Sequence, residues 1–400
     1  MYVLFLTQKF PYPLKDGGAI ATSQIINGIS KLARKVFVLS FNTVKHFIEE
    51  EHIPKGYIEN YKFKLINIDT TPKKTGGILN LLFSNKPYNL QLFKSNSFQK
   101  ELIELLNRIQ FDMVQIEGLY MLQYIPVIRK YSNARIAFRP HNLEHQIWEQ
   151  LARNQNVGLK RFYFKLLSNR ILNFEKNMLN SYDLILPISP EDASMYQTIG
   201  NIKPLKIIPT GFNLSKDKKP NTKKSEHTLF FIGSLEWRPN QQGLIWFMDY
   251  CWPKINRILP QLEFHIAGRN SPDWLRKRCS LPGIIWHGEV ESSCAFMEDK
   301  TIMVAPLLSG SGMRVKIIEA FTLSKVVVAT TSAAKGTGAI DGEHILVADN
   351  HITFVDKLIL LIENREFYNN LAQKAFAYSK DNFNNEKISE ELYQFYLSNL

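Results

Sequence analysis

The sequence lacks the features that mark several protein classes. Its 400 residues include only three cysteines, Cys251, Cys279 and Cys294, and no two of them form a CxxC pair. This small, odd number argues against a disulfide framework and favours a reducing compartment. No run approaches the roughly 18 apolar residues of a membrane-spanning helix, and the start lacks the basic and long apolar segments of a signal peptide. We therefore expect a cytoplasmic protein that at most touches the inner face of a membrane.

Acidic residues are the minority among the charged ones. There are 37 Asp and Glu residues against 49 Lys and Arg residues, so the formal net charge is +12. That excess indicates an anionic partner, such as nucleic acid, a phosphorylated ligand or an acidic membrane, unless it is only a Lys-rich surface. The chain is 45% apolar and 12% aromatic, which excludes a disordered protein. Its length exceeds what one hydrophobic core supports and predicts two domains.

Short β-rich runs alternate with helical patterns along most of the chain. This alternation predicts parallel sheets covered by helices on both faces. The polar, Lys-rich segment 213–227 interrupts it and indicates a surface connector. We expect an N-terminal domain over 1–212, a C-terminal domain over 228–380, and a helical segment 381–400 that packs back on the first domain. The predicted strands are 2–7, 35–40, 64–68, 113–116, 135–138, 184–188, 206–208, 229–233, 263–268, 284–288, 301–306 and 326–330.

Two glycines follow the first predicted strand. Gly17 and Gly18 precede a helical pattern, and the free N–H groups of a helix start, with the helix dipole, form an anion site. The motif is not GxGxxG, and the acidic residue expected about 20 positions later is absent, which disfavours a nicotinamide cofactor. A plain glycine turn is the alternative.

His141 follows the strand predicted to end at Phe138. Side chains just past strand ends form ligand sites in open parallel sheets, although a lone loop histidine is often structural. His145 lies four residues later and could share a helix face with His141, as a zinc pair would. No third ligand has metal-site spacing, so we expect no metal.

The C-terminal half has similar strand ends. Gly233 ends a strand, Arg238 follows in a predicted loop where it could reach an anion, and Asn240 is a candidate N-cap of the next helix. A capped helix with a surface arginine is the alternative. Gly268 ends the next strand, where a glycine lets the backbone approach a planar ring.

The stretch PLLSGSGMRVKIIEAF (306–321) joins a buried strand to a helix. On an ideal helix Lys316 and Glu319 lie about 60° apart, whereas Arg314 and Lys316 lie about 200° apart. Only one of these two cations can then lie in regular helix and face a phosphate, so the other must sit at the helix start. An i,i+3 salt bridge on a solvated face is the alternative. Small residues and a methionine before the helix leave space for a diphosphate: Gly310, Ser311, Gly312 and Met313.

Together these motifs resemble the retaining GT-B glycosyltransferases, specifically family GT4. The resemblance runs almost from end to end, through PYPLKDGGAIATSQIINGIS, HNLE, FIGSLEWRPNQQGLIWF, PLLSGSGMRVKIIEAFTLSKVVVAT and DGEHILVADN. GMRVKIIEA (312–320) is similar to the Gly-rich, TRxKxxEA-like string of one branch. The resemblance implies two Rossmann-like, doubly wound domains facing a central cleft, with a nucleotide-sugar donor on the C-terminal domain and the acceptor on the N-terminal one.

The resemblance also implies roles for single residues. Glu319 would bind the ribose hydroxyls, Arg314 and Lys316 would neutralise the diphosphate, and His141 would lie near the transferred sugar. His141 and Glu319 are the expected catalytic residues. The expected donor-binding residues are Gly17, Gly18, Gly233, Arg238, Asn240, Gly268, Gly310, Ser311, Gly312, Met313, Arg314, Lys316 and Glu319.

The sequence departs from the family at Ser311. It stands eight positions before Glu319, where the family often has a glutamate that contacts the donor sugar, so the sugar is left open. No DxD motif occurs, which disfavours a metal-bound diphosphate, and helix N-termini with cations stabilise a leaving phosphate without a metal. The resemblance implies a retaining hexosyltransferase for surface polysaccharides with a glycan or lipid-linked acceptor, and we expect it to act without a metal, a cofactor or a nucleic-acid partner. The alternatives are a GT-B sugar-nucleotide epimerase and a non-catalytic nucleotide-sugar-binding protein.

Residues 151–180 form a basic, amphipathic pattern. The segment has one acid, Glu175, and its apolar residues recur at helical spacing. Such a helix either lies on an anionic membrane or packs on the domain with its basic residues in solvent. Its cations are Arg153, Lys160, Arg161, Lys165, Arg170 and Lys176.

Overall fold

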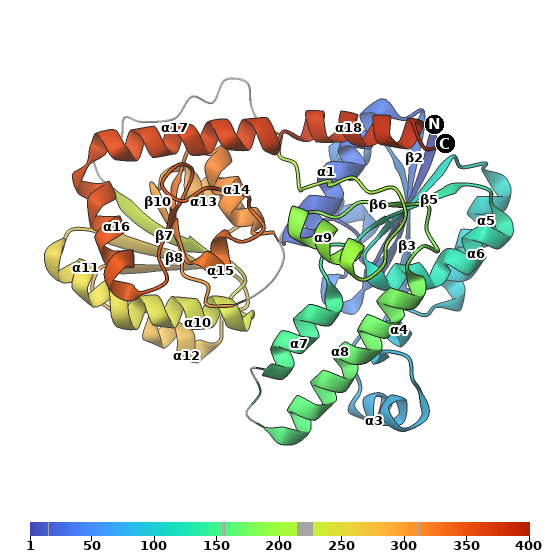
Figure 1. Cartoon of the computed structure of the whole chain (residues 1–400), viewed down its shortest axis with the longest axis horizontal. Coiled ribbons are helices and arrows are strands. Elements are labelled where there is room, and N and C mark those ends of the chain that lie inside the picture. The colour runs from blue at the N-terminus through green and yellow to red at the C-terminus, as the bar shows by residue number, and fades with distance from the viewer. Residues whose placement is uncertain (15, 154, 156, 214–226, 310–312) are drawn as a thin grey trace. The chain divides into compact units, whose positions relative to one another are not determined.

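The computed structural model describes residues 1–400 apart from 15, 154, 156, 214–226 and 310–312. The chain divides into two compact units, which we call unit 1 (Met1–Gly211 with Asn385–Leu400) and unit 2 (Phe212–Asn384). Over the described residues each unit contains a parallel six-stranded sheet with flanking helices (Figure 1), so the predicted architecture is confirmed. The expected connector at 213–227 lies almost entirely outside the described residues.

The sheet of unit 1 has the strand order β3-β2-β1-β4-β5-β6, and all neighbouring strands are parallel. Helical crossover connections join successive strands, as parallel pairing requires. This order places the ends of β1, β4 and β5 side by side. The strands are β1 (Tyr2–Thr7), β2 (Lys35–Thr43), β3 (Lys62–Ile68), β4 (Met113–Glu117), β5 (Arg135–Arg139) and β6 (Leu184–Ile185).

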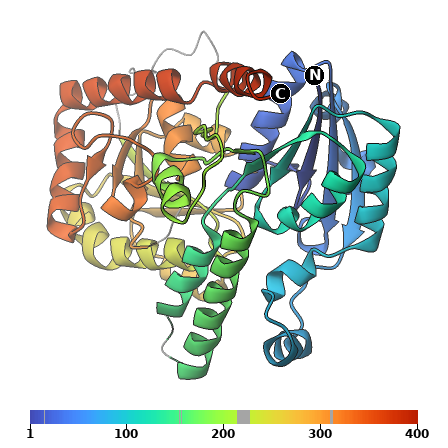
Figure 2. The same cartoon turned by 45° about the vertical axis from the view of Figure 1, so that its right-hand side comes forward.

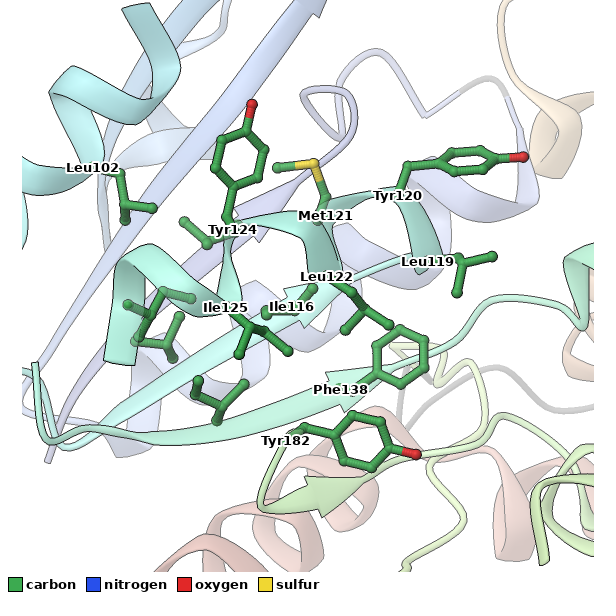
Figure 3. Close-up of a cluster of buried hydrophobic side chains, with 14 of the residues drawn as sticks. Leu102, Ile116, Leu119, Tyr120, Met121, Leu122, Tyr124, Ile125, Phe138 and Tyr182 are labelled. Carbon is green, nitrogen blue, oxygen red and sulfur yellow. The ribbon is translucent and has the colours of Figure 1, made fainter. Parts of the chain in front are cut away.

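Alternate residues of these strands pack on opposite faces of the sheet, because side chains in a strand alternate in direction. Leu4 and Leu6 join one buried cluster, and Val3 and Phe5 join another. Figure 3 shows part of the first cluster, around Ile116. The helices of unit 1 are α1 (Gly17–Leu32), α2 (Lys55–Ile58), α3 (Lys74–Phe83), α4 (Tyr88–Leu92), α5 (Asn96–Arg108), α6 (Ile125–Tyr131), α7 (Glu144–Arg153), α8 (Gly158–Met178), α9 (Pro190–Thr198) and α18 (Asn385–Leu397), with 3-10 turns η1 (Val44–His46), η2 (Glu50–His52) and η3 (Leu119–Tyr124).

The C-terminal helix α18 packs on α1 in unit 1 (Figure 1). The two helices approach closely at Gly28, where a Cβ atom would lie 1.8 Å from the Ser389 hydroxyl. Further along α18, the buried Tyr396 hydroxyl donates a hydrogen bond to Gln115 of β4. The end of the chain therefore completes the core of the unit in which the chain begins.

The sheet of unit 2 repeats this design with the order β12-β11-β10-β7-β8-β9, again with parallel neighbours. Leu229 and Phe231 of its central strand β7 join a buried cluster with helices α10, α11 and α16. The strands are β7 (Thr228–Ile232), β8 (Glu263–Ala267), β9 (Ile284–Gly288), β10 (Ile302–Ala305), β11 (Val326–Ala329) and β12 (Leu346–Val347). The helices are α10 (Arg238–Trp246), α11 (Trp252–Ile258), α12 (Asp273–Arg278), α13 (Ser293–Glu298), α14 (Val315–Thr322), α15 (Thr331–Ala334), α16 (His351–Glu363) and α17 (Arg365–Asn382), with a π-helical turn η4 (Phe247–Cys251) between α10 and α11.

Two strand predictions were wrong at the far edge of the first sheet. The predicted strand 184–188 has only two residues in β6, and 206–208 forms no strand, although Leu205 makes an isolated bridge to Ile185. Pro187 has no N–H group to donate to a ladder, so regular pairing stops before it. The backbone instead continues through single bonds such as Ile208 N to Pro187 O at 2.7 Å.

The predicted basic segment 151–180 spans two helices rather than one. Figure 1 shows α7 and α8 lying side by side as a helical hairpin. Leu167 and Ile171 of α8 are buried against the core, as the apolar pattern indicated. Among the described residues no helix is both long and apolar enough to span a membrane.

Candidate functional site

A buried ion pair lies at the carboxyl ends of β4 and β5 in unit 1. Glu117 ends β4, Arg139 ends β5, and the two residues are register partners. Arg139 Nη1 donates to Glu117 Oε2 at 3.2 Å, and both side chains are buried. The Arg139 guanidinium also donates to the carbonyl oxygens of Ala21 and Ile208. A buried charge of this kind needs such partners, because the loss of hydration is costly.

His141 completes this cluster at the surface side of the ion pair. Its Nε2 atom lies 2.6 Å from Glu117 Oε2. Burial alone would raise the pKa of Glu117, but the charge of Arg139 and the bond to His141 outweigh it and lower the pKa to about 2. Glu117 is therefore ionised at neutral pH and only accepts hydrogen bonds, so His141 Nε2 carries the proton. A neutral His141 then has an acceptor at Nδ1.

The Nδ1 atom of His141 is directed toward the start of α1. A Cβ atom built on Gly18 would lie 3.7 Å from it. Gly17 and Gly18 are the first residues of α1, and Asp16 caps the helix by accepting from Ala19 N at 2.9 Å. The structure therefore brings the sequence-predicted Gly18 and His141 together, from segments more than 120 residues apart.

A pocket of ≈ 270 Å³ lies beside this cluster in unit 1. Its volume is close to the roughly 300 Å³ lower end of small-molecule sites. The lining combines one carboxylate with two lysines and two histidines, and it adds several hydroxyls, which suits a polar or anionic ligand. These residues include Glu117, His141, Gly18, Lys9, Lys45, His46, Thr7, Thr22, Thr43, Thr70 and Phe93.

His141 and His145 do not form a pair in the structure. His145 is buried, and its Nδ1 atom hydrogen-bonds Glu175 rather than facing His141. Glu144 accepts from Tyr120 at 3.1 Å, and burial together with Glu175 raises the pKa of Glu144 to about 7. Over the part of the chain that the structure describes, no group of three His, Cys, Asp or Glu side chains has a metal-site arrangement.

The central group in unit 2 is Glu319 of α14, which is buried. Lys316 Nζ donates to Glu319 Oε2 at 2.7 Å, the i,i+3 contact that the helical spacing predicted. Ser293 Oγ donates to Glu319 Oε1 at 2.6 Å, and Cys294 Sγ lies 3.2 Å from the same atom. Ser293 and Cys294 begin α13, and no motif in the sequence indicated them.

Arg314 occupies the N-cap position of α14. The prediction that one cation sits at the helix start is therefore confirmed. Its guanidinium lies 5.4 Å from the centre of the Trp237 ring, which is within cation–π range. Burial lowers the pKa of Arg314 to about 10, so the side chain keeps its charge at neutral pH. Met313 beside it is buried, and Gly310, Ser311 and Gly312 lie outside the described residues.

The prediction that Asn240 caps a helix was wrong. Helix α10 begins at Arg238, Trp237 holds the N-cap position, and Asn240 lies inside the first turn. The Asn240 amide donates to Ser234 O at 2.8 Å, so it ties the helix to the loop after β7. Arg238 is the exposed first residue of α10. Pro239 favours this earlier start, because its fixed φ suits the first turn of a helix.

Gly268 follows β8 where two strand ends meet. A Cβ atom on Gly268 would lie 2.2 Å from the Gly233 carbonyl oxygen and 2.6 Å from Leu235 Cγ. Only a glycine fits without moving backbone. Gly233 and Gly268 thus stand together, and their demonstrated role is the close approach of two backbone segments.

Sequence reasoning missed Glu117 and Arg139, although a usable signal was present. Glu117 directly follows the predicted strand MVQI (113–116), and a charged residue at the end of a buried strand marks the same edge of the sheet that His141 marks. Its partner Arg139 belongs to another strand, and the local spacing of residues does not predict which strands pair.

Residues 226–364 match the family model "Glycosyl transferases group 1". The chain is 23% identical over 403 residues to an "Uncharacterized 44.6 kDa protein in cps region" of Klebsiella pneumoniae, with 98% of this chain and 99% of the relative covered. The chain also resembles Anabaena HepE in complex with UDP and glucose, with a TM-score of 0.69, 14% identity and 100% of both chains covered.

Sucrose-phosphate synthase of Thermosynechococcus elongatus has a TM-score of 0.70 at 14% identity, with 100% of this chain and 99% of that chain covered. At these identities the likeness shows the fold, while the narrower family GT4 stays a prediction. The chain therefore has the GT-B fold, and its residues 226–364 match the model of the group 1 glycosyl transferases.

Proposed function

We propose that this protein is a retaining, metal-independent glycosyltransferase. It moves a sugar from a nucleotide-diphosphate sugar to a glycan or lipid-linked acceptor. The observation that carries the proposal is the arrangement after β10, where Arg314 stands at the start of α14 and the buried Glu319 lies one turn further along. This arrangement falls inside the region that matches group 1 glycosyl transferases.

Glu319 is suited to hold the ribose of the donor. A carboxylate offers about four acceptor positions, and three donors from the described residues occupy Glu319: Ser293, Cys294 and Lys316. A remaining position would accept from a ribose hydroxyl. Lys316 holds the carboxylate in place and is partly exposed, so its ammonium group is also within reach of a ligand.

The diphosphate leaving group gains negative charge as the sugar departs. Arg314 keeps its charge at neutral pH because its pKa is about 10. A cation already in place and shielded from water stabilises a developing charge more strongly than one in bulk water. The free N–H groups at the start of α14 would also stabilise this negative charge. These groups would allow transfer without a metal ion or a cofactor.

His141 is proposed to bind the transferred sugar. Glu117 fixes the ring by accepting from Nε2, which leaves Nδ1 to accept a hydrogen bond from a sugar hydroxyl. Gly17 and Gly18 would approach the donor from the same unit. The basic lining of the neighbouring pocket suits an acceptor that carries a phosphate or a carboxylate.

The relatives agree with this assignment. HepE of Anabaena was solved with UDP and with UDP-glucose, which supports a nucleotide-sugar donor. The Klebsiella pneumoniae relative is described by its place in the cps region, which supports a role in a surface polysaccharide. We place this enzyme in the cytoplasm, at the inner face of the membrane.

The test is an NMR experiment on the purified protein with UDP-, GDP- and dTDP-sugars, in the presence of EDTA and without acceptor. Slow hydrolysis that releases the sugar with its anomeric configuration retained would support the proposal. Formation of an epimer would assign an epimerase, and binding without turnover would assign a binding protein. Glu319→Gln should abolish hydrolysis, while Glu366→Gln, which changes an exposed carboxylate of α17, should leave it unchanged.

A further inference from the structure

Two segments of unit 1 contain no acidic residue at all. Residues 70–100 hold five Lys residues and no Asp or Glu, and residues 150–174 hold five Lys and Arg residues and again no Asp or Glu. The chain has 37 acids in 400 residues, so about three would be expected in the first segment and two in the second. The fold brings the two segments together, because the first includes α3 and the second includes most of α8.

Arg170 of α8 holds α3 in place. Its guanidinium donates to Asn80 O at 3.2 Å, to Asn80 Oδ1 at 3.0 Å and to Leu81 O at 3.2 Å. Three hydrogen bonds from one charged group are a strong attachment. Figures 1 and 2 show that α3 and the α7–α8 hairpin extend from the sheet of unit 1 toward the same side.

Large apolar side chains lie exposed on both helices. On α3 Leu79 is 58% exposed and Phe83 is 81% exposed, four residues apart on one helical face. At the start of α8 Leu159 is 84% exposed and Phe162 is 65% exposed, three residues apart, and Val157 before them is 54% exposed. Single exposed apolar residues are common, but a group of five on two attached helices marks a binding surface.

Exposed cations stand among these apolar side chains. Lys160, Arg161 and Lys165 of α8 are all exposed, and Lys160 and Arg161 lie between Leu159 and Phe162 in the sequence. Apolar residues that enter the headgroup region, with cations that contact lipid phosphates, are the two components by which a surface helix binds an anionic bilayer. A protein partner would need acidic groups to match these cations. Its own basic groups would find no Asp or Glu within residues 70–100 or 150–174.

We propose that this surface, formed by Val157, Leu159, Phe162, Leu79 and Phe83 with the cations of α8, docks unit 1 on an anionic lipid bilayer. Leu159 and Phe162 enter the boundary between headgroups and acyl chains. Lys160, Arg161 and Lys165 contact the lipid phosphates. The protein lies on the membrane and does not cross it. This inference stands on unit 1 alone and does not depend on the proposed sugar transfer.

The experiment is cosedimentation of the full chain with vesicles of phosphatidylcholine, with and without one third phosphatidylglycerol. We expect binding to the anionic vesicles only, weakened by added salt, because screening reduces the attraction. The triple variant K160E/R161E/K165E should lower the partition coefficient by at least about 100-fold, since each basic residue contributes about 1 kcal/mol near an anionic surface. The variant L159S/F162S should lower it by at least about tenfold.

Two matched variants control for nonspecific effects. Ile202→Ser removes an apolar side chain that is 82% exposed elsewhere on unit 1, and K62E/R108E/K130E reverses three exposed cations away from α8. Both should bind vesicles like the wild type. Absence of binding by the wild type, or equal loss in the controls, would overturn the proposal. A wild-type dimer that L159S/F162S converts to a monomer in light scattering, without vesicle binding, would assign the surface to a second copy and also overturn it.

Discussion

The buried pair of Glu117 and Arg139 makes the substitution Glu117→Gln the most informative test of unit 1. Burial alone would raise the pKa of Glu117, yet Arg139 and His141 together lower it from 4.5 to about 2. A shift of this size means that ionised Glu117 stabilises the folded unit by about 3 kcal/mol. Glutamine keeps the shape of the side chain but leaves Arg139 buried without a counter-charge, which costs about 3–5 kcal/mol at pH 7.

The pH dependence follows from the direction of the shift. Because the folded pKa of Glu117 is depressed, its stabilisation is fully present above the unfolded pKa near 4.5 and is lost as the pH falls toward 2. The difference in unfolding free energy between wild type and Glu117→Gln should be constant from pH 8 to about pH 5. Below about pH 5 this difference in unfolding free energy should decrease by up to about 1.4 kcal/mol per pH unit.

The assay must read unit 1 separately, because a chain with two units need not unfold in one step. Of the six tryptophans only Trp148 belongs to unit 1, so urea unfolding followed by fluorine NMR of 5-fluorotryptophan resolves it. Glu104→Gln, which alters an exposed carboxylate of α5, should change stability by less than about 0.5 kcal/mol at every pH. A difference for Glu117→Gln that is the same at pH 3 and pH 7 would refute the reasoning.

Three further predictions concern unit 2. Glu319→Ala and Lys316→Ala should each weaken the calorimetric affinity for UDP or GDP by about tenfold or more, because hydrogen bonds to charged groups contribute roughly 1.5–3 kcal/mol. Gly268→Ala would force a Cβ atom to within 2.2 Å of the Gly233 carbonyl oxygen, so urea unfolding of unit 2 should show a loss of about 1–3 kcal/mol. The exposed Cys294 lies against Glu319, so bound UDP should slow its alkylation by iodoacetamide, measured by mass spectrometry.

Each of these predictions has an internal comparison. Unchanged affinity in both donor-site variants would contradict the placement of the donor. Gly158→Ala adds a Cβ atom in unit 1 that meets nothing within 4 Å. If it destabilised unit 1 as much as Gly268→Ala destabilises unit 2, crowding would not be the cause. Burial raises the pKa of the Cys251 and Cys279 thiols to about 12 and about 11, so these thiols should stay unmodified. A rate at Cys294 that UDP does not change would contradict its place beside the donor.

The fold was predictable because its signals are local. Apolar runs such as 2–7 and 302–305 are too short for helices and are separated by helical patterns, which leaves parallel strands with crossover helices as the consistent solution. The prediction failed after Ile185, because Pro187 has no N–H group for strand pairing. It also failed at Asn240, because helix α10 begins two residues earlier, at Arg238.

The candidate site was predictable in part. The glycines at 17 and 18, His141 and the segment 313–319 all lie at strand ends or helix starts, which sequence pattern can locate. The relation between Lys316 and Glu319 follows from the helical repeat alone. The same geometry predicted that one of the two cations stands at the helix start, since two cations about 200° apart in regular helix cannot face one ligand, and the structure shows that this cation is Arg314.

The sequence by itself thus determined the architecture, the positions of the strand ends and the contacts within one helix, because each depends on residues a few positions apart. Only the tertiary structure decided that Glu117 joins Arg139 and His141, 22 and 24 residues away, and that Glu319 receives Ser293 from 26 residues away. It also decided that Arg170 joins α8 to α3, each of which exposes large apolar side chains. These contacts join different elements, and their distance in space is set by how sheets and helices pack, which local spacing does not encode.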